Sequence, residues 1–202
     1  GLREFDKSIP EEINKLLSDA VTDLFFAPTE TGRINLEREG KTKNVYVTGD
    51  ISLDLLKDME YRIDVEQKYN VKVGDYYFMT CHRAANTDNP DNLFEIMKAI
   101  EALDNIVLWP MHPRTKKAID NIDKSWSPPH LKVIDTCGFV ETQCLIKGAK
   151  FVITDSGGII KECYFHRVPA VIIDKQTEWL ETVVEGWNTI AGPDADGILK
   201  VI

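Results

Sequence analysis

The most constraining feature of the sequence is a repeated alternation of short apolar runs with amphipathic stretches. Seven runs rich in Val, Ile and Phe predict strands at residues 24–27, 44–47, 76–80, 106–110, 131–134, 151–154 and 170–173. Between them, helices are predicted at residues 10–21, 30–39, 51–66, 91–103, 114–121, 140–148, 157–166 and 178–185. Strands that alternate with helices through short connections predict βαβ units, and therefore an α/β fold with a Rossmann-like parallel sheet.

Boundary residues refine three of these helices. Ser8 and Glu11 fit a capping box with Pro10 in the first turn. Asn89 is expected to cap the helix that follows it, and Gly40 to end the helix before it.

The strand count divides the chain near residues 48–50. Residues 49–202 supply five strands with their helices, which is enough for one complete Rossmann-like domain. Residues 1–48 supply only helix, strand, helix and strand, too little to bury both faces of their own sheet. We therefore predict that residues 1–48 are the remnant of an N-terminal Rossmann-like domain.

Composition excludes several classes of function. The formal net charge of -9 argues against a nucleic-acid partner, and no apolar run reaches the length of a membrane span. The four cysteines form no C-x-x-C pair and lie in or beside apolar runs, which favours buried free thiols in a cytoplasmic protein over a disulfide framework or a zinc site.

The strongest candidate site is the segment 154–158, Thr-Asp-Ser-Gly-Gly, between a predicted strand and a predicted helix. Ligands of open α/β sheets bind at the carboxyl ends of the strands. Gly157 and Gly158 let the backbone approach an anion at the helix start, and Ser156 offers a cap and a hydroxyl. Glu162, four residues beyond Gly158 on the same face, can accept hydrogen bonds from ribose hydroxyls. The alternative is a plain N-cap with a tight turn.

Three further segments carry polar groups that suit a site. His82 and Arg83 follow the strand 76–80, and His112 lies between two prolines after the strand 106–110. Glu11 and Lys15 share one helix face and suit acid–base chemistry. The alternatives are a surface or core histidine, a stiff strand-to-helix turn, and a solvated ion pair beside a helix cap.

Together these segments resemble the non-hydrolysing UDP-N-acetylglucosamine 2-epimerases. The resemblance rests on motifs that occur in order along almost the whole chain, at residues 1–3, 10–14, 27–31, 47–50, 82–90, 112–114 and 154–158. Residues 177–188 are similar to the branch that includes archaeal members and UDP-diacetamido-glucuronate 2-epimerases.

The resemblance implies a glycosyltransferase-B type fold of two Rossmann-like domains, with no metal and no nicotinamide cofactor. It implies a reaction on a UDP-N-acetylhexosamine or related UDP-sugar, in which a base removes the proton beside the acetamido group, UDP departs and then adds back. It implies catalytic roles for His82 and for an acid–base set with Glu11 and Lys15. The implied substrate-binding residues are Arg83, Asn86, His112, Arg114, Ser156, Gly157, Gly158 and Glu162.

The sequence departs from the family pattern at several positions. Ala85 replaces a glutamate, Lys15 an arginine, Ala20 a histidine, Ile160 a glutamine and Asp174 an arginine. The family's His-Val-Glu-Ala segment would precede Gly1, so we expect negligible turnover from residues 1–202 alone.

Two other functions stay open at this point, namely a binding module that keeps the UDP cradle without turnover and a glycosyltransferase of the same architecture. A homodimer is a further hypothesis, because the incomplete first segment would expose apolar strands.

Overall fold

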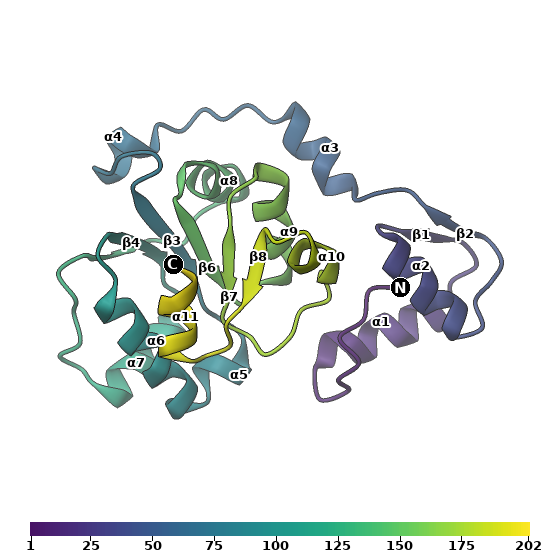
Figure 1. Cartoon of the computed structure of the whole chain (residues 1–202), viewed down its shortest axis with the longest axis horizontal. Coiled ribbons are helices and arrows are strands. Elements are labelled where there is room, and N and C mark those ends of the chain that lie inside the picture. Colours follow the sequence, from purple (N-terminus) through teal and green to yellow (C-terminus); the bar gives the residue numbers. More distant parts are fainter. The chain divides into compact units, whose positions relative to one another are not determined.

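The computed structural model describes residues 1–202 as two compact units, residues 1–59 and residues 60–202 (Figure 1). The predicted division at residues 48–50 lies before the helix α3 (Ile51–Asp58), which the structure groups with the first unit. The interpretation of residues 1–48 as the remnant of an N-terminal domain stays a prediction.

The first unit is built in the predicted order of helix, strand, helix and strand, followed by a third helix. Its elements are α1 (Pro10–Ala20), β1 (Phe25–Ala27), α2 (Glu30–Arg38), β2 (Val45–Val47) and α3 (Ile51–Asp58). The strands β1 and β2 pair in parallel, with Phe25 opposite Val45. Gly40 follows α2 with a φ of 81°, a left-handed conformation that suits glycine after a helix end.

The prediction of a capping box at Ser8 and Glu11 is wrong. Ile9 occupies the N-cap position of α1, and no side chain caps this helix. The N–H of Ser8 instead donates to Oδ1 of Asp6, which forms a turn just before the helix. Pro10 lies in the first turn of α1, as expected.

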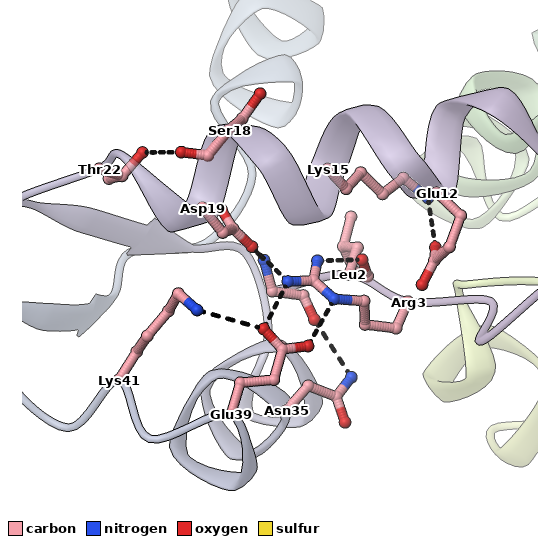
Figure 2. A network of polar contacts seen from close by, with 12 residues as sticks. Leu2, Arg3, Glu12, Lys15, Ser18, Asp19, Thr22, Asn35, Glu39 and Lys41 are labelled. Atoms are coloured by element: carbon pink, nitrogen blue, oxygen red, sulfur yellow. Dashed lines mark hydrogen bonds and ion pairs between the residues drawn. The ribbon is translucent and has the colours of Figure 1, made fainter. Parts of the chain in front are cut away.

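Arg3 joins the opening segment to α1 and to the end of α2 (Figure 2). Its guanidinium donates to both carboxylate oxygens of Glu39 at 2.8 and 2.9 Å and to Asp19 at 2.5 Å. The carboxylate of Glu12 accepts the backbone N–H groups of Glu4 and Phe5. Polar contacts therefore hold residues 3–5 against α1 and the end of α2.

The second unit contains one six-stranded parallel sheet in the order β5-β4-β3-β6-β7-β8. The strands are β3 (Tyr76–Thr80), β4 (Ile106–Pro110), β5 (Leu131–Ile134), β6 (Phe151–Thr154), β7 (Ala170–Ile172) and β8 (Asn188–Ile190). The helices are α4 (Val65–Tyr69), α5 (Ala84–Thr87), α6 (Pro90–Ala102), α7 (Pro113–Ile122), α8 (Phe139–Gly148), α9 (Gly157–His166), α10 (Leu180–Val184) and α11 (Ala195–Val201).

Both faces of this sheet are buried, which explains the near-continuous apolar strands. Tyr77 and Met79 pack on one face with residues of α6 and α11. Tyr76 and Phe78, which alternate with them, pack on the other face with residues of α8 and α9. The predicted α/β fold with a Rossmann-like parallel sheet is therefore present, and the sheet has six strands where five were predicted.

The predicted helix at residues 51–66 is two helices in the structure. Met59 is extended, with a ψ of 135°, and so ends α3. Asp64 then starts α4, because its side chain accepts the N–H of Gln67. Asn89 caps α6 as predicted, by accepting the N–H groups of Asp91 and Asn92.

Three of the four cysteines, Cys81, Cys144 and Cys163, are buried, while Cys137 is partly exposed, and all four are free thiols. Burial raises the pKa of the Cys163 thiol well above its usual value. None of the helices combines the length and the apolarity that crossing a membrane requires.

Candidate functional site

The carboxyl edge of the large sheet brings two of the predicted segments together. The strands β3 and β6 are neighbours, and Thr80 lies opposite Thr154 at their ends. The hydroxyls of these two threonines are 2.7 Å apart. The segment that begins at His82 and the segment 155–158 therefore leave the sheet side by side.

Asp155 holds these two segments together. Its side chain has no exposed surface, and its carboxylate accepts the backbone N–H groups of His82 at 3.0 Å and Arg83 at 2.9 Å. The amide of Asn86 also donates to Asp155, at 3.1 Å, and to the carbonyl of Ile173. Because three N–H groups satisfy the buried carboxylate, the loop after β3 is fixed relative to the start of α9.

His82 faces both Asp155 and solvent. Its Nδ1 lies 3.3 Å from Oδ1 of Asp155, while the side chain is 54% exposed. The contact orients the imidazole ring, since only one edge of the ring can face the carboxylate. The other ring nitrogen, Nε2, is then the one that can reach a ligand.

The first turn of α9 is open to solvent. Gly158 is exposed, and a Cβ at that residue would meet only Oγ of Ser156, at 3.9 Å. The first N–H groups of an α-helix have no partner within the helix, and the helix dipole makes this end positive. The helix start at Gly158 therefore has room for an anion, which the positive end of the helix dipole favours.

Ser156 is the N-cap residue of α9, but its side chain makes no capping hydrogen bond. Its backbone N–H donates to the hydroxyl of Thr154 at 2.9 Å. The predicted cap by the Ser156 hydroxyl is therefore wrong, because Ser156 occupies the position without bonding the helix amides.

Three polar groups gather beside Gly157. A Cβ at this residue would lie 3.2 Å from Oε1 of Glu178, 3.8 Å from Nε1 of Trp179 and 3.9 Å from Nη2 of Arg83. Arg83 also donates through Nη1 to Asp174 at 2.8 Å. Asp174 thus orients the guanidinium of Arg83 at this edge of the sheet.

Glu162 lies one turn along α9 from Gly158 and contacts a buried amide. Nε2 of Gln143, on α8, donates to Oε2 of Glu162 at 2.7 Å. Oε1 of the same Gln143 amide lies 2.9 Å from Nε2 of His166. Burial and, to a smaller extent, the nearby ammonium of Lys147 lower the pKa of His166 to about 4.

Acid should therefore destabilise the second unit through His166. Between about pH 6.5, the ordinary midpoint for histidine, and pH 4, the unfolded chain binds a proton that the folded chain does not, so stability falls as pH falls. Urea midpoints from tryptophan fluorescence at pH 7 and pH 4.5 measure this loss. The variant His166→Phe keeps a ring against Tyr61 and should show a smaller loss. An equal loss in both proteins contradicts the prediction.

His112 and Arg114 lie at the end of β4, the other neighbour of β3. His112 is the N-cap of α7, and its Nδ1 accepts the N–H of Arg114 at 3.2 Å. The Arg114 guanidinium pairs with Asp88, and both side chains are more than half exposed. The hydroxyl of Thr115 donates to the carbonyl of Cys81, which ties α7 to the end of β3.

Glu11 and Lys15 lie on α1 in the first unit. Glu11 is exposed, whereas its neighbour Glu12 is buried. The ammonium of Lys15 lies 3.7 Å from Oε2 of Glu12. The sequence pattern indicated Glu11 and gave no role to Glu12. Adjacent residues on a helix face different sides, and here Glu12 is the one that faces the protein interior.

Sequence reasoning assigned no role to Asp155 or Gln143. Asp155 was visible within the motif at residues 154–158, and its place directly after a strand was the available signal. Gln143 had no such signal, because it lies 19 residues from Glu162 in the middle of a helix. The structure contains no group of three or more His, Cys, Asp or Glu side chains that could hold a metal ion.

The six-stranded parallel sheet with helices on both faces defines a Rossmann-like α/β domain. All of residues 1–202 match the model of the family UDP-N-acetylglucosamine 2-epimerase, and the chain belongs to that family. The resemblance predicted from the sequence motifs is thereby confirmed.

Individual relatives agree with this assignment. A UDP-N-acetylglucosamine 2-epimerase homolog of Methanococcus maripaludis is 38% identical over 100% of this chain and 59% of its own length. The UDP-2,3-diacetamido-2,3-dideoxy-D-glucuronate 2-epimerase of Pseudomonas aeruginosa is 35% identical over 99% of this chain and 57% of its own length. The chain therefore spans less than two thirds of the length of these relatives.

A solved structure supports the fold. The UDP-GlcNAc 2-epimerase of Methanocaldococcus jannaschii, in complex with UDP-GlcNAc and UDP, superposes with a TM-score of 0.85 at 36% identity. The match covers 99% of this chain and 59% of that protein. The predicted fold class, with its glycosyltransferase-B type neighbours, is confirmed.

Proposed function

We propose that this chain carries the UDP-binding part of a UDP-N-acetylglucosamine 2-epimerase, which interconverts UDP-GlcNAc-type and UDP-ManNAc-type sugars. The observation that carries the proposal is the open start of α9 at Gly158, on the sheet edge that also carries His82 and Arg83. Family membership along the whole chain and a relative in complex with UDP-GlcNAc and UDP support it.

In the proposed reaction, a base removes the proton from the sugar carbon that bears the acetamido group. The bond between the anomeric carbon and the UDP oxygen breaks, and a glycal-like intermediate forms. Protonation on the opposite face and return of UDP complete the inversion. Negative charge grows on the departing diphosphate, so donors aimed at that group stabilise the transition state most.

The residues of the second unit suit the departing UDP. Ser156, Gly157 and Gly158 would hold the diphosphate with the amides of the helix start, and Glu162 would accept hydrogen bonds from the ribose. His82 would donate through Nε2 to the diphosphate, in an orientation that Asp155 fixes. Completing this substrate-binding set are Arg83, Asn86, His112 and Arg114.

For the proton transfers, we assign Glu11 and Lys15 of α1 to the acid–base set. Glu11 is exposed, so its carboxylate is accessible to a ligand. The ammonium of Lys15 lies within ion-pair distance of the buried carboxylate of Glu12. This ion pair would hold the ammonium of Lys15 in one place on the helix.

Calorimetry on residues 1–202 tests the binding half of the proposal. UDP should bind at least about tenfold more tightly than uridine, because charge-assisted hydrogen bonds to the diphosphate supply much of the affinity. The variant His82→Ala should weaken UDP and leave uridine nearly unchanged. A folded chain that gives no heat with UDP would falsify the assignment of the cradle.

Compartment and assembly are also proposals. We propose a cytoplasmic protein, and the four free thiols without a disulfide fit a reducing compartment. We further propose a homodimer, because exposed apolar side chains such as Phe26, Tyr46 and Ile51 lie on the first unit. Light scattering on the purified chain reports the mass directly.

A further inference from the structure

Gln143 is a buried amide that joins two polar residues of α9. Its side chain has no exposed surface, although it lies on α8 among apolar neighbours such as Leu145 and Ile146. Nε2 of Gln143 is 2.7 Å from Oε2 of Glu162, and Oε1 of Gln143 is 2.9 Å from Nε2 of His166. A buried polar side chain is costly unless both of its ends are satisfied, and here they are.

The chemistry of the partners fixes the direction of the amide. A carboxylate only accepts hydrogen bonds, so the NH₂ group of Gln143 must face Glu162. The carbonyl of Gln143 also only accepts, so Nε2 of His166 must carry the proton that it donates. The ring of Tyr61 packs edge-on against His166, with ring centroids 5.7 Å apart, and restricts rotation of the imidazole. The series His166, Gln143 and Glu162 therefore has one consistent arrangement.

We infer that Gln143 and His166 are positioning residues that hold the Glu162 carboxylate ready for ribose hydroxyls. The inference rests on the proposed function, in which Glu162 contacts the ribose of UDP. A glutamate on a helix surface samples several rotamers, and ordering it on binding weakens affinity. Because Gln143 orders Glu162 before a ligand arrives, the entropy of ordering this side chain is lost on folding and not on binding. Glu162 then favours a ribose over a deoxyribose.

The test compares UDP with 2′-deoxy-UDP in calorimetry. In the unmodified chain we expect UDP to bind about tenfold more tightly, since the hydroxyl donates to a charged acceptor. In Gln143→Met, which keeps length and loses both hydrogen bonds, the preference should fall below about twofold, with UDP weakened and 2′-deoxy-UDP little changed. A change at Gln143 that only loosened the fold would weaken both nucleotides equally.

Two further variants make the test specific. Gln67→Met makes the same exchange at an exposed residue of α4 and should leave the preference unchanged. His166→Phe keeps Gln143 but removes its donor, and should lower the preference to an intermediate value. Nitrogen-15 spectra of the unmodified chain should show His166 as the neutral ring with its proton on Nε2. If Gln143→Met does not fold, His166→Phe provides the same comparison.

The outcomes separate the inference from the function on which it rests. If the unmodified chain does not bind UDP, the proposed function is wrong. If UDP and 2′-deoxy-UDP bind equally well, Glu162 does not contact the ribose 2′-hydroxyl and the inference is wrong. The proposed binding of the diphosphate at the start of α9 is not affected by that result. A full preference that survives in both Gln143→Met and His166→Phe overturns the inference alone.

Discussion

Replacing Gly158 by aspartate is expected to abolish UDP binding, with a loss of at least about 100-fold in affinity, while the chain stays folded. Gly158 is the second residue of α9 and faces open space, so a side chain fits there without displacing a neighbour. A carboxylate at this position would sit at the positive end of the helix, where the diphosphate is proposed to bind. It would repel that anion and compete with it for the same N–H groups.

The same substitution should preserve or slightly raise stability. An acidic side chain in the first turn of a helix contributes about 0.3–1 kcal/mol, and the loss of a glycine favours the helix further. Calorimetry with UDP and urea unfolding measure the two effects separately. Gly158→Asn has nearly the same shape without the charge and should lose less than about tenfold in affinity. Equal losses for Asp and Asn, or an unchanged affinity for Asp, would contradict the electrostatic explanation.

Much of the large sheet could be predicted because burial dictates it. Strands covered on both faces must be apolar at consecutive positions, and Tyr76–Thr80 and Ile106–Pro110 have the predicted bounds in the structure. The strand Asn188–Ile190 was missed because its residues are Asn, Thr and Ile, with one apolar side chain among them. At the sheet edge, pairing with β7 determines the strand, and this pairing is a tertiary contact that periodicity does not reveal.

The candidate site divides in a similar way. Positions at the carboxyl edge of the sheet follow from topology, because every parallel strand delivers its next residues to the same edge, and His82, His112 and Ser156 were found on that basis. Side chains that orient these residues are set by contacts between distant segments. Asp155 lies 73 residues from His82, so the hydrogen bond between them leaves no trace in local sequence.

Breaking the contacts of Arg3 is expected to open the first unit selectively. The hydrophobic side chains buried in residues 1–59 are only Phe25, Ala27, Leu36 and Leu56. Arg3, which is 3% exposed, binds Asp19 on α1 and Glu39 at the end of α2 (Figure 2). Hydrogen bonds from Arg3 lower the pKa of Glu39. Removing the cation leaves two partly buried carboxylates without their main partner, which costs about 3–5 kcal/mol in comparable sites.

The variant Arg3→Met should therefore speed amide exchange in α1 and α2 by more than about 100-fold at pH 7. The four tryptophans, Trp109, Trp126, Trp179 and Trp187, all lie in residues 60–202, so the urea transition seen by their fluorescence should stay in place. Arg33→Met removes a partly exposed arginine that pairs with the exposed carboxylates of Glu30 and Glu37 on α2, and should change stability by less than about 1 kcal/mol. Because protonation of Glu39 removes the charge that Arg3 balances, the effect of Arg3→Met should shrink as pH falls below about 4.5. Similar exchange rates in the Arg3 and Arg33 variants at pH 7 would show that the buried contacts contribute no more than the exposed ones.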